Sequence, residues 1–262
     1  MKWTAFASDY IRHPPSGVVV LIYHRIGART ALDVDMPLAN FAAQMETLAA
    51  TGRVQSLDAA LDALGQDIPP PVDPIVITFD DGTADFAEIA LPVLARHGLP
   101  STLYAATQFI DEGRSFPAHG VPLSWAALRD VHASGIVTVG SHTHSHALLD
   151  RLAPGAIAEE LDRADDLIEE HLGVRPSHFA YPKAVAGSSP ADAAVRSRYR
   201  SAALAGTRPN RYGATDPHRL SRSPIQNSDG TRFFAAKVKG GMGAEDSVRV
   251  VVNKWRYRDA TE

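Results

Sequence analysis

Apolar residues along the chain follow two alternating patterns, which are short continuous runs and longer stretches with helical spacing. The continuous runs are typical of strands buried on both faces, and they lie at 18–23, 75–79, 101–106 and 136–140. Helical spacing is found at 38–50, 57–64, 125–131 and 154–172. This strand-then-helix order predicts an α/β fold in which helices cover a parallel sheet, either open or closed into a barrel.

The spacing of apolar residues is less regular near both ends of the chain. Residues 1–16 end in Pro14-Pro15-Ser16 and are predicted to form an irregular lead-in to a single domain over 17–262. Shorter strands are predicted at 179–181, 201–204 and 220–225, with a helix at 191–199. Two further helices are predicted at 233–238 and 247–257.

Composition narrows the possible functions. A net charge of -4 gives no general electrostatic reason to expect nucleic acid as the partner. The chain has no cysteine, so any metal must be held by His, Asp, Glu or water. The first nine residues lack the apolar core of a secretory signal, and no apolar run approaches the roughly 20 residues of a membrane span. We therefore expect a cytoplasmic protein with no transmembrane segment.

Two polar clusters follow predicted strands, which is where parallel α/β sheets place their sites. The first is Asp80-Asp81-Gly82, in which adjacent carboxylates point in different directions, so that one can bind a metal while the other faces a water. The alternative is that one of these Asp residues caps the following helix.

The second cluster contains His142, His144 and His146, three of the eleven histidines of the chain within five residues. Neutral imidazole is the commonest ligand for zinc and related divalent ions. Spacing leaves the binding pair open, because an extended segment places all three on one side and a helical turn aligns only the outer two. One Asp and two His form a suitable set for metal-assisted hydrolysis, in which a nearby carboxylate takes a proton from water.

The two motifs resemble those of the polysaccharide deacetylase family, also called the NodB-homology family or carbohydrate esterase family four. Thr78-Phe79-Asp80-Asp81-Gly82 resembles its first motif and His142-Thr143-His144-Ser145-His146 its second, about sixty residues later. The resemblance implies a distorted (β/α) barrel. It also implies that Asp80 is the catalytic base and that Asp81, His142 and His146 bind a divalent metal, Zn²⁺ first, with Co²⁺, Ni²⁺ or Mn²⁺ as alternatives.

The rest of the family pattern is changed in this chain. Many members carry an Arg where Ala180 stands, and Arg222 resembles an Arg that some subgroups supply from a later strand to orient the base; a surface Arg is the alternative. No histidine after His218 matches the closing motif that supplies the general acid. His24 is the expected substitute, with His218 as second choice and a purely structural His24 as the alternative.

The third motif is expected to contribute to the substrate cleft. Tyr181 and Pro182 are assigned to its lining, with the Tyr181 backbone N–H as a donor to the oxyanion. The resemblance implies a hydrolase that removes the N-acetyl group of an amino sugar in a carbohydrate. The alternatives are hydrolysis of another amide or ester, such as a formylated sugar or an O-acetyl glycan, and a carbohydrate-binding protein without turnover.

Overall fold

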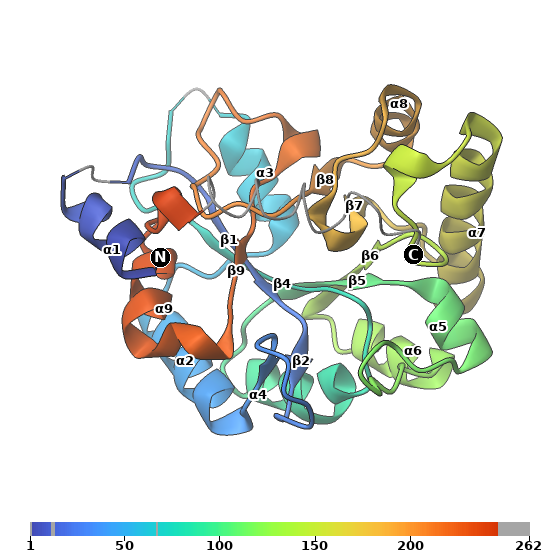
Figure 1. The fold of residues 1–262 in the computed structure, drawn as a ribbon, viewed down its shortest axis with the longest axis horizontal. Helices are drawn as coiled ribbons and strands as arrows, with labels where there is room; N and C mark the ends of the chain where they lie inside the picture. The colour runs from blue at the N-terminus through green and yellow to red at the C-terminus, as the bar shows by residue number, and fades with distance from the viewer. Residues whose placement is uncertain (1, 12–13, 67, 246–262) are drawn as a thin grey trace.

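The computed structural model describes residues 2–11, 14–66 and 68–245, and its centre is a sheet of seven parallel strands (Figure 1). The spatial order of the strands is β8-β7-β6-β5-β4-β1-β9. Their bounds are Val19–Tyr23 (β1), Ile75–Phe79 (β4), Ser101–Ala105 (β5), Val137–Ser141 (β6), His178–Ala180 (β7), Ser201–Ala203 (β8) and Ser223–Pro224 (β9). The four strands predicted from continuous apolar runs are confirmed, since their side chains are buried almost throughout.

The sheet is curled, and its two edge segments approach each other. Leu220, just before β9, forms a parallel bridge with Ala203 of β8. The Leu204 N–H donates to the Leu220 carbonyl and the Gly206 N–H to the Arg222 carbonyl, each at 2.8 Å. The fold is therefore the expected single-domain, distorted (β/α) barrel.

Helices lie around the outside of the sheet (Figure 1). Their bounds are Leu38–Thr51 (α2), Leu57–Leu64 (α3), Leu91–Arg96 (α4), Thr107–Glu112 (α5), Trp125–Ala133 (α6), Pro154–Leu172 (α7), Ser189–Arg198 (α8) and Gly230–Val238 (α9). The predicted amphipathic helix at 154–172 is confirmed: Ile157, Leu161 and Ile168 are buried, and Gly173 ends the helix with a left-handed φ of 72°. Among the described residues, no helix has the length and apolar character needed to cross a membrane.

The prediction of an irregular lead-in over residues 1–16 is wrong, because Lys2–Ile11 forms helix α1. Its stabilising partner is distant in sequence: the rings of Trp3 and Phe6 contact Phe233 of α9, with centroids 5.3 and 6.0 Å apart. Ala5 is buried in the same cluster. The α1 and α9 helices lie side by side in Figure 1.

Two elements differ from the prediction, and the segment before α4 contains an irregular turn. The predicted strand at 220–225 is reduced to a bridge at Leu220 and the short β9. A single π-helical turn, Phe86–Ala90, precedes α4 where Pro92 removes a backbone donor. Helix α5 was not predicted, and the helix predicted at 247–257 lies outside the described residues.

Candidate metal centre and active site

The backbone after β4 separates its two carboxylates. Asp80 continues the sheet, with its N–H donating to the Tyr23 carbonyl at 3.1 Å. Asp81 then adopts a φ of 76°, and its carbonyl accepts from the Ala106 N–H at 2.9 Å. Gly82 follows at φ 95°, a conformation that favours glycine. The reversal directs Asp80 toward β9 and Asp81 toward β6, so neither serves as a helix cap.

Asp80 forms a bidentate ion pair with Arg222. The two guanidinium nitrogens donate to its two oxygens at 2.6 and 2.9 Å. Arg222 also donates to the Leu204 carbonyl and to Thr78 Oγ1, and it is 1% exposed, which excludes the surface alternative. Burial alone would raise the pKa of Asp80, but the charge of Arg222 and its hydrogen bonds to the carboxylate outweigh burial and hold that pKa well below its usual range.

Asp81, His142 and His146 converge on one point beside this pair. The Nε2 atoms of His142 and His146 lie 3.8 and 3.6 Å from Asp81 Oδ1. One possible ligand atom from each residue lies within 4.8 Å of the others. Of the two alternatives for the histidine cluster, the structure has the one in which the outer pair converges.

Both histidines are oriented as metal ligands would be. His142 Nδ1 lies 2.7 Å from the Ala180 carbonyl oxygen, to which it donates when it carries the ring proton. The Nε2 lone pair then faces Asp81. Burial, with a smaller effect of nearby His142, lowers the pKa of His146 to about 4, so its ring is neutral near pH 7. The left-handed φ of 63° at His146 is a strained conformation typical of functional sites.

His144 points elsewhere. Its Nδ1 lies 2.9 Å from Thr107 Oγ1 at the start of α5, and burial lowers the pKa of the ring. The middle histidine of the motif therefore contacts a neighbouring helix.

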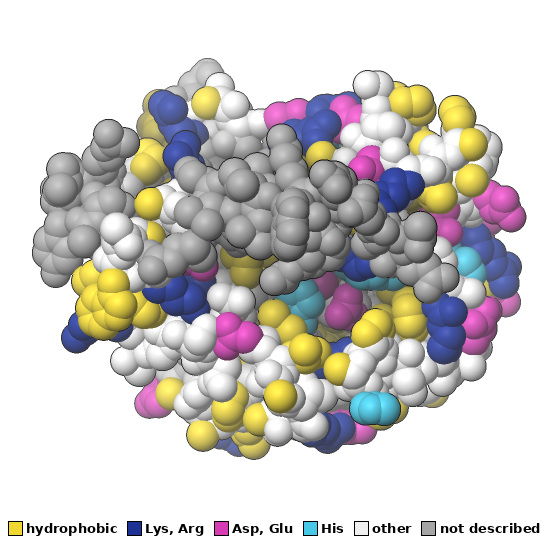
Figure 2. All heavy atoms as spheres, in the orientation of Figure 1, with side chains coloured by type: hydrophobic (Ala, Val, Ile, Leu, Met, Phe, Trp, Pro, Cys, Tyr) yellow, Lys and Arg dark blue, Asp and Glu magenta, His cyan; other side chains and the backbone are white. Residues whose placement is uncertain are grey.

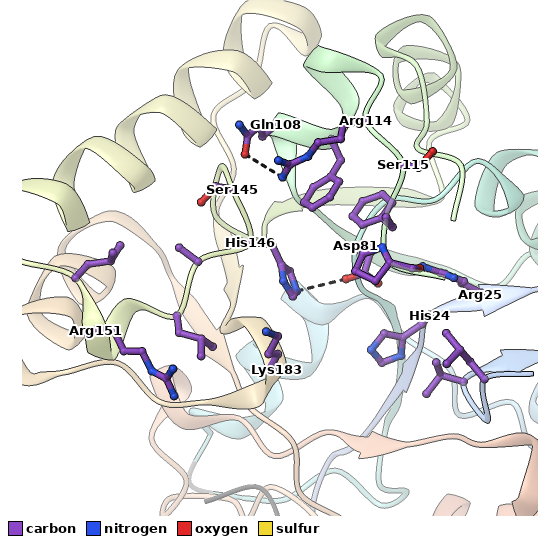
Figure 3. Close-up of a pocket in the computed structure, with 18 residues that line it drawn as sticks. His24, Arg25, Asp81, Gln108, Arg114, Ser115, Ser145, His146, Arg151 and Lys183 are labelled. Atoms are coloured by element: carbon purple, nitrogen blue, oxygen red, sulfur yellow. Dashed lines mark hydrogen bonds and ion pairs between the residues drawn. The ribbon is translucent and has the colours of Figure 1, made fainter. Parts of the chain in front are cut away.

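A pocket of about 880 Å³ is lined by Asp81 and His146 of the converging trio, and His142 is buried behind them. Figure 2 shows histidine and acidic side chains together near the middle of this face. His24 lines the pocket, as Figure 3 shows, and its Nδ1 atom is buried with no hydrogen-bond partner among the described residues. This observation is contrary to a structural His24 whose Nδ1 is bonded to backbone.

The assignments of Tyr181, Pro182 and His218 need correction. The Tyr181 N–H donates to the Ala203 carbonyl at 3.0 Å, so it is used within the sheet. Its side chain is buried among Phe179, Tyr199 and their neighbours, and Pro182 is also buried outside the pocket lining. His218 does not line the pocket either, because its Nε2 contacts the Tyr199 carbonyl at 2.8 Å.

Several residues of the pocket wall were missed from the sequence. They lie on α5, in loops or in short 3-10 turns, and they are Gln108, Arg114, Ser145, Arg151 and Lys183. Lys183 directly follows the Tyr-Pro dipeptide, so proximity to the third motif was the available signal. Ser145 lies within the second motif, which was its signal. The other three carry no pattern that distinguishes them from surface residues.

The converging trio fits a divalent transition metal. Ligand atoms held at about 2.0–2.1 Å around one tetrahedral ion are roughly 3.4 Å apart, close to the two measured separations of 3.6 and 3.8 Å. Two imidazoles and one carboxylate are a donor set suited to Zn²⁺. Three protein ligands also leave coordination positions for water or substrate.

Comparison with known sequences connects this geometry to a family. The family model for polysaccharide deacetylase matches residues 67–202, which include both motifs. The chain belongs to the polysaccharide deacetylase family. It is 30% identical over 171 residues to YxkH of Bacillus subtilis strain 168, covering 64% of this chain and 57% of that protein. A chitin deacetylase of Arthroderma benhamiae is 31% identical over 111 residues, covering 41% of this chain and 27% of that protein.

Solved structures match a larger part of this polysaccharide deacetylase homologue than the sequence relatives do. IcaB from Ammonifex degensii matches with a TM-score of 0.74 and 27% identity, covering 86% of this chain and 98% of that one. A polysaccharide deacetylase from Bacillus cereus matches with a TM-score of 0.70 and 25% identity, covering 85% and 69%. Deacetylase PplD of Streptococcus pyogenes, with a TM-score of 0.73 and 20% identity over 84% and 97%, shares the fold.

Proposed function

We propose that the protein is a metal-dependent hydrolase that removes the acetyl group from an N-acetylated amino sugar of a poly- or oligosaccharide or glycoconjugate. The observation that carries the proposal is the position of the buried Asp80–Arg222 pair directly beside the Asp81, His142 and His146 trio. A chitin deacetylase among the relatives supports an N-acetyl sugar as the substrate.

The metal site is assigned to Asp81, His142 and His146. A divalent ion held there, Zn²⁺ in the first instance, would lower the pKa of water and polarise a carbonyl. The Ala180 carbonyl fixes the ring of His142 through Nδ1, so that Nε2 faces the ion.

Asp80 is assigned as the base that removes a proton from the attacking water. Arg222 holds both of its oxygens, and Asp80 Oδ2 lies 4.0 Å from His142 Nε2, so the carboxylate is fixed beside the metal ligands. Arg222 keeps Asp80 ionised, so Asp80 is available as a base at neutral pH. The low pKa of Asp80 makes it a weak base.

His24 is assigned as the acid that protonates the departing amine. It approaches the pocket from the end of β1, on the side of Asp81 away from α7 (Figure 3). Protonated His24 would donate a proton to the nitrogen as the bond to the acyl carbon breaks, releasing acetate and the free amino sugar.

The decisive experiment measures metal content and acetate release on N-acetylated sugars for wild type, Asp80→Asn and Asp81→Asn. We expect Asp80→Asn to keep its metal and lose at least a hundredfold in kcat, and Asp81→Asn to lose both. Asp130→Asn, an exposed position on α6, is the matched control and is expected to match wild type. Undiminished turnover in Asp80→Asn would refute the assigned base.

The same substrate panel tests the alternative chemistries. Release of formate, or of acetate from O-acetyl esters only, would place the substrate among other amides or esters. Metal and oligosaccharide binding without any turnover would indicate a binding protein.

A further inference from the structure

The inside of the curled sheet contains an aromatic ring that the proposed function does not use. Tyr104 is on β5, which lies between β4 and β6 (Figure 1). Because successive side chains of a strand point to opposite faces, Leu103 and Ala105 join the core under the helices while Tyr104 points the other way. Tyr104 belongs to a cluster of side chains from other strands that meet inside the curl, among them Val20, Val76, Ala180 and Ala203.

The ring of Tyr104 lies against Arg222, the residue that holds Asp80. The guanidinium carbon of Arg222 lies over the ring, 5.0 Å from its centroid, and Tyr104 and Arg222 are 0% and 1% exposed. A guanidinium within about 6 Å of an aromatic ring is attracted to the face of the ring, more strongly where water is excluded. Hydrogen bonds hold the nitrogens of Arg222, and the ring adds a contact to the carbon between them.

The hydroxyl group of Tyr104 takes no part in this contact. Its oxygen is buried, and it has no hydrogen-bond partner among the described residues. The face of the ring is therefore the part of Tyr104 that acts on Arg222, and a phenylalanine would present the same face.

Strand β6 leaves the space that the ring occupies. Gly140 is paired with Tyr104 in the register of β5 and β6. A Cβ atom at position 140 would lie 2.7 Å from Cδ1 of the Tyr104 ring, which is too close for two carbon atoms. The glycine therefore permits the close approach of the ring. His142 follows two residues later, so the segment that presents a metal ligand also makes room for the support of Arg222.

We propose that Tyr104 is a positioning residue for the base: its ring holds the guanidinium of Arg222, and Arg222 holds Asp80 beside the metal ligands. The inference rests on the proposed function and adds a residue to its machinery. Tyr104 does not line the pocket, so it acts through Arg222 and not on the substrate. Because a displacement of about 1 Å at a catalytic group can cost about a hundredfold in rate, loss of the ring should lower kcat and leave KM unchanged.

Fluorinated phenylalanines at position 104 test the ring at nearly constant shape. Fluorine withdraws electron density from the face of the ring and so weakens its attraction for a cation. Tyr104→Phe is expected to keep kcat for acetate release within about threefold of wild type. A phenylalanine with three ring fluorines should lower kcat about fivefold or more, one with a single fluorine should fall between, and Tyr104→Leu should lower kcat about tenfold or more. KM and zinc content should stay within about twofold throughout the series.

A second measurement follows Arg222 itself. Exchange of its Nε–H proton with water, measured by heteronuclear NMR, should be slow in wild type and in Tyr104→Phe, and about fivefold or more faster with the trifluorinated ring. Phe179 is the control, because it is buried on β7 against Tyr181 and Tyr199. The trifluorinated ring at position 179 should leave both kcat and the exchange rate unchanged.

Equal kcat and equal exchange across the Tyr104 series would overturn the proposal, since a ring that only fills space does not respond to fluorination. An equal loss in the Phe179 control would overturn it as well. Absence of acetate release from wild type on every substrate would refute the deacetylase function, and the exchange measurement would still decide whether the ring holds Arg222. Active wild type with no response to fluorination would leave the deacetylase function standing and refute the role of Tyr104.

Discussion

At the scale of single residues, the buried ion pair of Asp80 and Arg222 links activity to stability. Their side chains are 7% and 1% exposed. Removing Arg222 leaves a buried carboxylate with no cation, so Arg222→Met is expected to cost about 3–5 kcal/mol of unfolding free energy in addition to activity. Urea denaturation followed by circular dichroism measures the loss.

The double variant Asp80→Asn with Arg222→Met separates charge from packing. It no longer contains an unpaired charge, so it should recover a large part of the stability that Arg222→Met loses, while remaining inactive. Arg222→Lys keeps the charge without the two-pronged contact and should fall between wild type and Arg222→Met. Equal stability of the single and double variants would contradict the charge argument.

His24 and His218 provide a matched test of the general acid. Of these two histidines, only His24 lines the pocket. His24→Gln is therefore expected to lower kcat by about 10²–10⁴. His218→Gln, at a residue whose ring contacts the Tyr199 carbonyl, should leave kcat within about twofold. Steady-state kinetics on the same N-acetylated substrate decides between them, and a larger loss in the His218 variant would reverse the assignment.

At the scale of secondary-structure elements, α7 contains a carboxyl group whose protonation is linked to stability. Asp165 is 1% exposed and accepts a hydrogen bond from the Tyr199 hydroxyl at 2.8 Å. Burial raises its pKa to about 6. The native state therefore binds the proton more tightly than the unfolded chain does. The stabilisation that results from this proton is fully present below about pH 4 and is lost as pH rises through 6. A shift of about two units corresponds to about 3 kcal/mol.

Asp165→Asn should remove this dependence on pH. The amide oxygen still accepts from Tyr199, so the variant is expected to be about 2–3 kcal/mol more stable than wild type at pH 8, and the difference should fall to about 1 kcal/mol at pH 4.5. Arg175 pairs with both Asp165 and its exposed neighbour Asp166, at 3.9 and 3.2 Å. Asp166→Asn is therefore the control and should change stability by less than about 1 kcal/mol at either pH. A destabilised Asp165→Asn at pH 8 would be contrary to the linkage.

How well each element and site residue could be predicted depended on where its stabilising contacts lie in the sequence. Strands β4 and β6 contain their own signal, since an apolar run buried on both faces is visible within five residues. Helix α1 packs on Phe233, more than two hundred residues away. Its own signal is short, since only Trp3, Phe6 and Tyr10 follow one another at helical spacing before Pro14. The Asp80–Arg222 contact spans 142 positions, and only the family resemblance suggested it. Tyr181 was misplaced because the direction of its N–H depends on the pairing of β7 with β8.

At the scale of the whole molecule, the candidate metal site joins two strands that are separated in the sheet by β5. Asp81 follows β4, and His142 and His146 follow β6. An ion bound to all three would therefore connect the ends of non-adjacent strands, and it would stabilise only the folded chain, because the unfolded chain does not bring the ligands together. Metal binding and global stability should thus be coupled.

That coupling is measurable as a shift in the melting temperature Tm by calorimetry, first in chelator and then with added Zn²⁺. At a free concentration of about 100 times Kd the expected stabilisation is about 2.7 kcal/mol, which for a chain of this size raises Tm by roughly 5–10 °C. Asp81→Asn and His146→Gln should lose most of the shift because each removes a ligand, whereas Asp80→Asn should keep it while losing activity. Asp130→Asn controls for a general effect of removing a carboxylate. An equal shift in the Asp81 variant would mean that zinc stabilises the fold at another place, and the assigned ligands would then be wrong.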